Sequence, residues 1–426
     1  MRPLGLRQGR LCSRLAGKRH RGSPHPFEGF PRIPGSTSVG AEGRALRQSR
    51  GTTRAPHVLP MKVLVYSSFD DVAIEHRSAF SYPCQPNFLL SYDWFEVLYS
   101  TSLQPAWRPR IYVVCAHDGA PQAALFCCTK SESEARTLCS MTNFYAIEYS
   151  VSFANGAADR NAALAALLEC IATERPRWHS VRLRLLKDSD PVSQAAAEGL
   201  SAKRFTTSRY FQYENWFLPV EGSFDEYYAR RSSQVRNTIE RKSKKLRKTH
   251  ATEIVVHRSV GQALDAAISG FETIYNASWK QPEPHVTFIP ALTRRAAELG
   301  ILRLGLLCVD GQPAAAQLWL TCAGRAIIYK LAYDERFADL GVGSILSKEL
   351  FRGAIDDDHV QEIDYGVGSE SYKKDWMTAC RRLEGLEAHN LHTLLGLSLS
   401  LTDASMSRLR HVRSALARLT SPADGR

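Results

Sequence analysis

The sequence predicts a mixed α/β fold made of two similar units, each a twisted sheet with helices on its faces. Apolar, strand-like runs alternate along the chain with amphipathic segments of helical period. The motif Asp-Gly-x-Pro-x-Ala-Ala occurs twice, from Asp118 to Ala124 and from Asp310 to Ala316, and Asp-Gly is a strong hairpin turn. Because both hairpins fall at the same place in similar orders of elements, we infer an internal duplication.

The first unit is expected at residues 61–220. Its helix near the start follows from Phe88, Tyr92 and Phe95, which stand at helical spacing. In chain order the predicted elements are a strand at 62–67, a helix at 88–99, the hairpin at 111–129, a strand at 143–153, a helix at 161–174, a strand at 180–187, a helix at 191–202 and a strand at 208–219.

The second unit is expected at residues 221–426 and repeats this plan. Its predicted elements are a basic helix at 224–248, a strand at 253–258, helices at 260–279 and 289–299, the hairpin at 302–322, a strand at 327–333, a helix from 344, a strand at 360–365, and further helix and strand.

A Gly-x-Gly turn, Gly341 to Gly343, stands between a strand and a helix of the second unit. It suits a connection that needs a positive φ. It equally suits an anion site, because a helix N-terminus presents unpaired N–H groups and glycine lets a phosphate approach the backbone. The corresponding stretch of the first unit, 154–161, has no Gly-x-Gly and brings an Asp toward the helix start. We therefore expect only the second unit to bind an anion there.

The composition, 44% hydrophobic and 23% charged, is that of an ordinary globular protein. Of the net charge of +12, most lies in residues 1–60, where twelve Lys and Arg face two acidic residues, so the remaining body is nearly neutral. This segment is expected to be a disordered basic extension. An organellar transit peptide is one alternative, and a true start at Met61, which leaves 1–60 untranslated, is the preferred one.

No apolar run reaches the length of a membrane span. The ten cysteines have no metal-binding spacing and lie mostly in apolar strands, which predicts a reduced, cytoplasmic protein without a metal. The run Asp356 to His359 offers four adjacent ligand types in a polar turn, which rarely converge on one ion. Gly-x-Ser-x-Gly and Walker-type motifs are absent from the sequence, which leaves serine hydrolase and P-loop chemistry without support.

The second unit resembles the BioF-like acetyltransferase domain of CelD-like proteins, a branch of the GNAT acyltransferases related to the Fem peptidyltransferases. The resemblance covers residues 223–389, and more loosely the body from Met61 as tandem GNAT-like units. Its marks are the basic helix, Ser278-Trp279-Lys280, the hairpin ending at Gln317, the turn Leu340 to Ser344, and the stretch IDYGVGSESYKKDW from Ile363 to Trp376.

The resemblance implies an acyl-CoA donor, acetyl-CoA or another acyl-CoA. Two parallel strands, 327–333 and 360–365, would splay apart to admit its pantetheine arm. The usual loop pattern, Gln/Arg-x-x-Gly-x-Gly/Ala, is altered, since Ala338 holds the first position and Arg336 stands two residues earlier. The loop residues that would cup the pyrophosphate are Leu340, Gly341, Val342, Gly343 and Ser344.

Acyl transfer to an amine needs a deprotonated amine, a polarised carbonyl, a proton for the departing thiolate and alignment of the reactants. Tyr372 is the candidate proton donor, because the resemblance implies a Tyr near the sulfur; a packing aromatic is its alternative. Asp364 would take the amine proton or hold the acceptor amine, or it caps the following helix. The other candidates bind substrate, and each has a structural alternative: Trp279 and Trp376 as pocket walls or core, Gln317 in the cleft or on the sheet surface, and Lys373 on a phosphate or carboxylate or in solvent.

The basic stretch 230–248 carries nine Lys and Arg against one Glu. It is either a solvated face or a contact with an anionic acceptor, a nucleotide-linked sugar or tRNA. Without interleaved aromatics it has no base-stacking platform, which disfavours other nucleic acids.

We therefore expect an acyl-CoA-dependent N-acyltransferase whose second unit is catalytic and whose first unit carries a degenerate cofactor loop. The acceptor would be a small-molecule or sugar-linked amine, and the CelD-like resemblance suggests exopolysaccharide or cell-envelope biosynthesis. Fem-type transfer from aminoacyl-tRNA, and a non-catalytic partner of polysaccharide assembly, are the alternatives.

Overall fold

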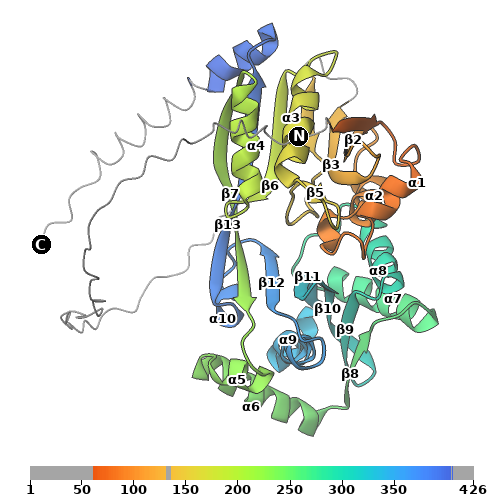
Figure 1. Cartoon of the computed structure of the whole chain (residues 1–426). Coiled ribbons are helices and arrows are strands. Elements are labelled where there is room, and N and C mark those ends of the chain that lie inside the picture. The colour runs from red at the N-terminus through yellow and green to blue at the C-terminus, as the bar shows by residue number, and fades with distance from the viewer. Residues whose placement is uncertain (1–60, 131–135, 404, 406–426) are drawn as a thin grey trace, which may run out of the picture. The chain divides into compact units, whose positions relative to one another are not determined.

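The structure is a computed structural model of the 426-residue chain and describes residues 61–130, 136–403 and 405. The basic extension predicted at 1–60 lies outside these residues. One mixed sheet of 13 strands runs through the described part of the chain (Figure 1). None of the described helices combines the length and apolar composition that a membrane crossing requires.

The strand order of this sheet is symmetric about its centre. From one edge it runs β1 (Lys62–Tyr66), β2 (Trp107–Cys115), β3 (Pro121–Lys130), β4 (Thr137–Ser140), β6 (Ser180–Lys187) and β13 (Ala379–Asn390). From the other edge it runs β8 (Thr252–His257), β9 (Leu302–Val309), β10 (Gln312–Cys322), β11 (Arg325–Tyr333), β12 (Glu362–Val367) and β7 (Phe205–Pro219). Each series holds one Asp-Gly hairpin, β2–β3 or β9–β10, and one parallel pair, β4–β6 or β11–β12. The predicted tandem α/β fold is confirmed.

The last strand of each unit completes the sheet of the other. β7 ends the first unit in sequence but pairs with β12 of the second, while β13 ends the second unit and lies between β6 and β7. The β7–β13 ladder is antiparallel and runs from Phe217 opposite Ala379 to Phe205 opposite Asn390. The two sequence units therefore share one continuous central ladder.

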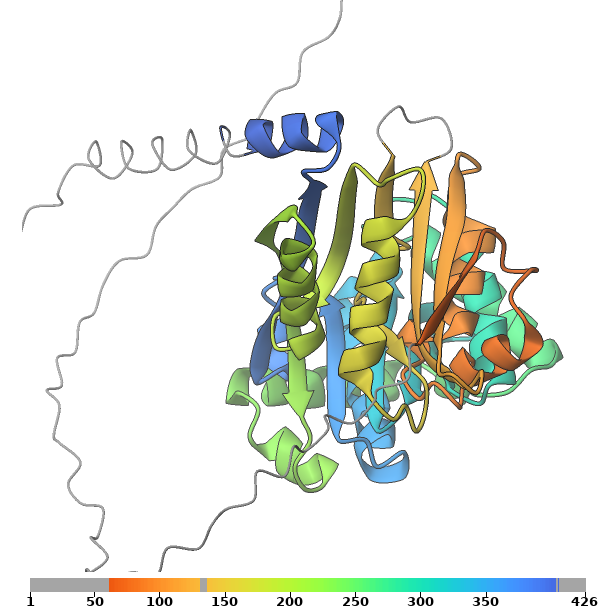
Figure 2. The same ribbon diagram turned by 45° about the horizontal axis from the view of Figure 1, so that its top comes forward.

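The helices repeat the same symmetry. In the first unit they are α1 (Ile74–Phe80), α2 (Tyr92–Ser102), α3 (Arg160–Thr173) and α4 (Pro191–Ala202). In the second they are α5 (Phe224–Ala229), α6 (Ser233–Thr249), α7 (Gln262–Asn276), α8 (Phe288–Glu298), α9 (Val342–Arg352) and α10 (Lys373–Trp376), and residues 394–403 are also helical. α3 packs on β1, β2 and β3, as α9 packs on β9, β10 and β11, and Figure 2 shows α3 and α4 on one face of the sheet.

Two predicted elements differ from the structure. The strand expected at 143–153 is reduced to β5 (Ser152–Phe153), and β4 lies upstream of it. Between them the chain leaves the sheet, because the backbone N–H of Tyr145 bonds the side chain of Asn143 and that of Tyr149 bonds the carbonyl of Leu185.

The single basic helix expected at 224–248 is two helices, α5 and α6, with a break at residues 230–232. Ser232 causes the break, because its side chain accepts the N–H of Val235 and starts a new helix. A capping box of Ser223 and Glu226 starts α5 in the same way.

A buried ion cluster joins the two halves. Glu148, from the loop of the first unit, is 5% exposed and pairs with Arg325 of β11 at 2.5 Å and with Lys187 of β6. Burial by itself raises the pKa of this carboxyl, but the charges of Arg325 and Lys187 outweigh it and hold the pKa well below its usual range. Loss of one partner from such a cluster destabilises the folded protein, because the remaining charges stay buried without compensation.

Candidate active site

The site begins where two parallel strands separate. β11 and β12 are hydrogen-bonded over three residue pairs, from Arg325 opposite Glu362 to Ile327 opposite Asp364, while β11 continues to Tyr333. A pocket of about 480 Å³ lies beside this divergence, between β11, α9 and the first turns of α6. The splayed strands implied by the resemblance are therefore present.

Several of the predicted site residues line this pocket. They are Trp279, Gln317, Gly343, Ser344, Tyr372 and Trp376. α6 also contributes to the lining, from Ser232 to Ile239, and sequence reasoning missed this contribution. The available signal was Ser232, whose side chain caps α6, so that this helix begins at Ser233 beside the pocket and not at residue 224.

The N-terminus of α9 opens onto the pocket and fits a phosphate. Gly341 has a φ of 71° and directly precedes the helix, whose first N–H groups, from Val342 to Ser344, have no partner within the helix. A Cβ on Gly343 would lie 3.1 Å from the ring of Tyr333, so only glycine fits without displacing that ring. Lys242 of α6 packs on Gly341 and adds a cation. This donor set suits the pyrophosphate of an acyl-CoA.

Arg336, the residue nearest to the missing Arg of the loop pattern, does not enter the pocket lining. Its guanidinium pairs with Asp334 at 2.6 Å, and its side chain is 71% exposed. The donors at this helix end are therefore the backbone N–H groups of α9 and the nearby side chain of Lys242.

Tyr372 lies at the pocket just before α10, with its ring against that of Tyr365 at 5.6 Å between centroids. Burial, and next the charge of Glu370, raise the pKa of Tyr372 to about 12. Its hydroxyl therefore keeps its proton at neutral pH.

Gln317 serves the loop as well as the pocket. Its side-chain amide donates to the carbonyl of Gly343 at 3.1 Å and to the hydroxyl of Ser347 at 2.7 Å, and its carbonyl accepts from Trp319. These bonds tie β10 to the first turns of α9. Gln317 is thus buried at the pocket and positions the helix N-terminus.

The two tryptophans take different places. Trp279 is about half exposed and packs at a tilt against Tyr333, with 4.5 Å between ring centroids, so it forms a wall of the pocket. Trp376 is buried and stacks on Phe351, with 4.7 Å between ring centroids, and it also contributes to the pocket lining.

Asp364 does not face the cleft, which corrects its expected place. It is 2% exposed, and its carboxylate accepts from Asn215 at 2.6 Å, from the backbone of Gly366 at 2.7 Å and from Arg381 at 2.7 Å. These partners saturate both oxygens. Asp364 therefore holds β12 to β7 and β13, and it neither caps the next helix nor reaches an acceptor amine.

Lys373 is neither solvated nor open to a ligand. It is 3% exposed, its ammonium donates to the carbonyl of Val367 at 2.6 Å, and it pairs with Glu370 at 2.9 Å. Lys373 thus holds the turn that carries Tyr372. Among the described residues that line the pocket, Asp375 is the carboxylate.

The first unit has a pocket of about 450 Å³ beside the N-termini of α3 and α4. Here Asp159 caps α3 by accepting the N–H of Ala162 at 2.8 Å. Asp190 caps α4 in the same way. Carboxylates therefore occupy the helix N-termini that an anionic cofactor would need.

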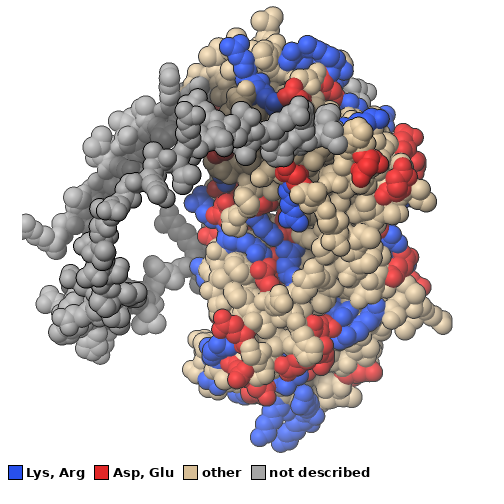
Figure 3. All heavy atoms as spheres, viewed as in Figure 1, with Lys and Arg blue, Asp and Glu red and all other residues tan. Residues whose placement is uncertain are grey.

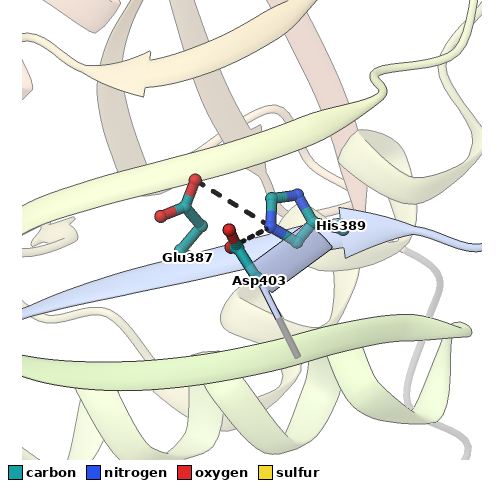
Figure 4. Close-up of side chains that lie close together, drawn as sticks. All are labelled: Glu387, His389 and Asp403. Carbon is teal, nitrogen blue, oxygen red and sulfur yellow. Dashed lines mark hydrogen bonds and ion pairs between the residues drawn. The ribbon is translucent and has the colours of Figure 1, made fainter. Parts of the chain in front are cut away.

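One group of possible metal ligands occurs among the described residues, at the end of β13 (Figure 4). It consists of Glu387, His389 and Asp403. His389 bonds Asp403 at 2.7 Å, and Glu387 is paired with Arg182 at 2.6 Å. The three side chains thus have protein partners, and they do not line the pocket of the second unit.

Comparison with known proteins identifies the second unit. Residues 233–374 match the family model of the GNAT acetyltransferase domain, a stretch that runs from α6 to the start of α10 and contains most of the residues that line the pocket. No curated protein matches the chain in sequence.

The structure is similar to several solved structures, and FemX shares its fold over most of the chain. FemX is 12% identical, with a TM-score of 0.54, over 76% of this chain and 96% of that one. A conserved protein of unknown function from Bacteroides thetaiotaomicron VPI-5482 is 13% identical, with a TM-score of 0.47, over 78% of this chain and 100% of that one. A tandem GNAT protein from the clavulanic acid biosynthesis pathway is 12% identical, with a TM-score of 0.41, over 76% of this chain and 98% of that one. The likeness to FemX confirms the predicted Fem-related GNAT fold.

Proposed function

We propose that this member of the GNAT acetyltransferase superfamily is an N-acyltransferase. It transfers an acyl group from acyl-CoA to an amine, and acetyl is the first candidate for that group. The observation that carries the proposal is the open N-terminus of α9 beside the diverging strands β11 and β12. A phosphate-binding helix end next to a gap between parallel strands accommodates both the charged and the extended part of such a donor.

Each part of the pocket has a task in this proposal. The backbone N–H groups of Val342, Gly343 and Ser344 and the ammonium of Lys242 bind the pyrophosphate, and Gln317 keeps that helix end in place. Acyl-CoA supplies a thioester, an acyl group with a good leaving group.

The reaction site lies at the turn that carries Tyr372. Tyr372 donates a proton toward the sulfur as the carbon–sulfur bond breaks. Asp375, in place of Asp364, is the carboxylate that holds the acceptor amine and takes the proton that the amine loses as the carbon–nitrogen bond forms. Trp279 covers the pocket from the side of Tyr333.

Calorimetric titration with acetyl-CoA, followed by measurement of thiol release with a panel of amines, tests the proposal. The Gly343→Trp variant fills the approach to the helix end and is expected to abolish acetyl-CoA binding while retaining the fold. Binding that survives in this variant contradicts the proposed donor site.

The setting of the reaction is part of the same proposal. The CelD-like resemblance supports a sugar-linked or other small amine of exopolysaccharide or cell-envelope biosynthesis as the acceptor. A cytoplasmic location is supported by the cysteines of the described residues, which are free thiols, many of them buried.

Fem-type transfer from an aminoacyl-tRNA is the second candidate, and the position of α6 favours it. The Lys and Arg side chains of this basic helix gather at the lower end of the molecule in Figure 3, and its first turns line the pocket. Retention of aminoacyl-tRNA on a filter, lost at high salt, would support it. If the chain binds neither acyl-CoA nor tRNA, the result would favour a non-catalytic partner of polysaccharide assembly.

A further inference from the structure

Three lysines and two glutamates gather next to the pocket, on the segment after α7, on β11 and on the turn after β12. Lys330 pairs with Glu283 at 2.7 Å, and Lys373 pairs with Glu370 at 2.9 Å. Within residues 61–130 and 136–403, Lys280 has neither a carboxylate partner nor a hydrogen-bond acceptor for its ammonium. The group as a whole is thus one negative charge short.

The ammonium of Lys280 is held by aromatic rings instead. It lies 5.7 Å from the ring centroid of Tyr275 and 5.8 Å from that of Trp279. The ammonium of Lys330 lies 5.7 Å from the same Tyr275 ring, so two cations share one aromatic face or edge. Cation–π contacts compensate a desolvated cation only partly.

The electrostatic consequence is measurable. Burial, and next the charge of Lys330, lower the pKa of Lys280 to about 8. Lys373 acts in the same direction, while Glu283 and Glu370 oppose the shift. An anion beside Lys280 would reverse this penalty, because an opposite charge favours the protonated amine.

The position of Lys280 places such an anion near the reaction. Its neighbour Trp279 lines the pocket and packs at a tilt against Tyr333. Glu370 and Lys373, which interact with Lys280 electrostatically, flank Tyr372 in sequence. Lys280 is therefore next in sequence to Trp279 of the pocket wall, and it is within electrostatic range of the turn that carries the proposed proton donor.

We propose that Lys280 binds a carboxylate of the amine acceptor, so that the acceptor class is an amino acid or peptide that carries both an amine and a carboxylate. This rests on the proposed N-acyltransferase function. A carboxylate fits because the group of three lysines and two glutamates has one uncompensated positive charge. Lys330 and Lys373 are each paired with a glutamate, which leaves that charge on Lys280. The phosphates of the donor have their own site at α9 and Lys242.

Binding of product mimics tests this without requiring turnover. N-acetylglycine and N-acetylglycinamide, which differ in one carboxylate, are titrated by calorimetry into the full chain with coenzyme A present. We expect the acid to bind about tenfold more tightly than the amide, the typical gain from a charge-assisted hydrogen bond. The preference should vanish in Lys280→Ala, persist in Lys280→Arg, and be unchanged in Lys62→Ala, which removes an exposed lysine of β1.

The pH dependence distinguishes a charge effect from a packing effect. As pH rises through about 8, Lys280 loses its proton and the wild-type preference for the acid should decline. In Lys280→Arg the preference should persist, because a guanidinium stays charged.

Two results would overturn the inference. One is equal binding of acid and amide, including no binding of either; the other is a preference that survives in Lys280→Ala. If Lys280→Ala weakens coenzyme A instead, the lysine belongs to the donor site. Acetyl-CoA titration of the wild type separately decides the proposed function, so the two failures are distinguishable.

Discussion

At the scale of single residues, environment decides which side chains can do chemistry. Tyr372 keeps its proton because burial, and then Glu370, raise its pKa to about 12. Asp364 has no free oxygen, because Asn215, Gly366 and Arg381 occupy both. Two residues eight positions apart, predicted as one catalytic pair, therefore have different tasks.

Replacing Tyr372 by Phe removes the proposed proton donor and little else. We expect kcat to fall about a hundredfold or more, with the Kd of acetyl-CoA unchanged. Because the folded pKa is about 12, wild-type activity should show no loss from this group near neutral pH, and loss should begin only as the pH approaches that value. The matched control is Tyr228→Phe, since the pKa of Tyr228 is also raised to about 12 and it lies on α5 outside the pocket. Equal kcat values for both variants would remove Tyr372 from the mechanism.

Asp364→Asn should act on stability. The change leaves Arg381 with Glu362 but removes one buried charged partner, so the free energy of unfolding in urea should fall by about 2 kcal/mol. Unchanged unfolding together with a collapse of kcat would restore the catalytic interpretation of Asp364.

At the scale of elements, two corresponding helices show how one architecture supports and blocks anion binding. α9 begins at Gly341, which offers no side-chain cap. α3 begins at Asp159, whose carboxylate already accepts an N–H of the first turn. The positive end of α9 is therefore open to a ligand, whereas that of α3 is neutralised by its own sequence.

Ser344→Asp separates helix stability from ligand binding. A carboxylate in the first turn of α9 favours the helix, so Tm should be retained or raised. The same charge repels a phosphate, and the Kd of acetyl-CoA should rise at least about tenfold. The control is Asn161→Asp in the first turn of α3, which should leave the Kd unchanged; calorimetry measures both. Normal acetyl-CoA binding by Ser344→Asp would mean that the donor does not use this helix end.

At the scale of the whole molecule, the exchange of β7 and β13 makes the halves interdependent. β13 lies between β6 and β7, so its removal would leave the backbone groups of both neighbours unpaired. The buried group of Glu148, Arg325 and Lys187 adds a second link between the halves.

We therefore expect residues 61–220 alone not to fold cooperatively. The complete chain should unfold in urea in one transition, with circular dichroism and tryptophan fluorescence changing together. A cooperative transition of the 61–220 fragment, or two separated transitions of the complete chain, would contradict this interdependence.

The sequence alone determined the local features and the duplication. The repeated Asp-Gly hairpins, the strand at 180–187 and the helix at 191–202 were predictable because turn chemistry, periodicity and capping act between near neighbours. The Gly341–Gly343 turn at the start of α9 was predictable for the same reason.

Only the tertiary structure decided which predicted side chains meet. The exchange of β7 and β13 and the partners of Asp364 depend on residues far away in the chain, such as Asn215 and Arg381. The same is true of the environment of Lys280, which has no carboxylate partner among the described residues. The hydrophobic periodicity of the sequence does not predict such pairings, because sheet order and the neutralisation of buried charges are set when distant strands come together.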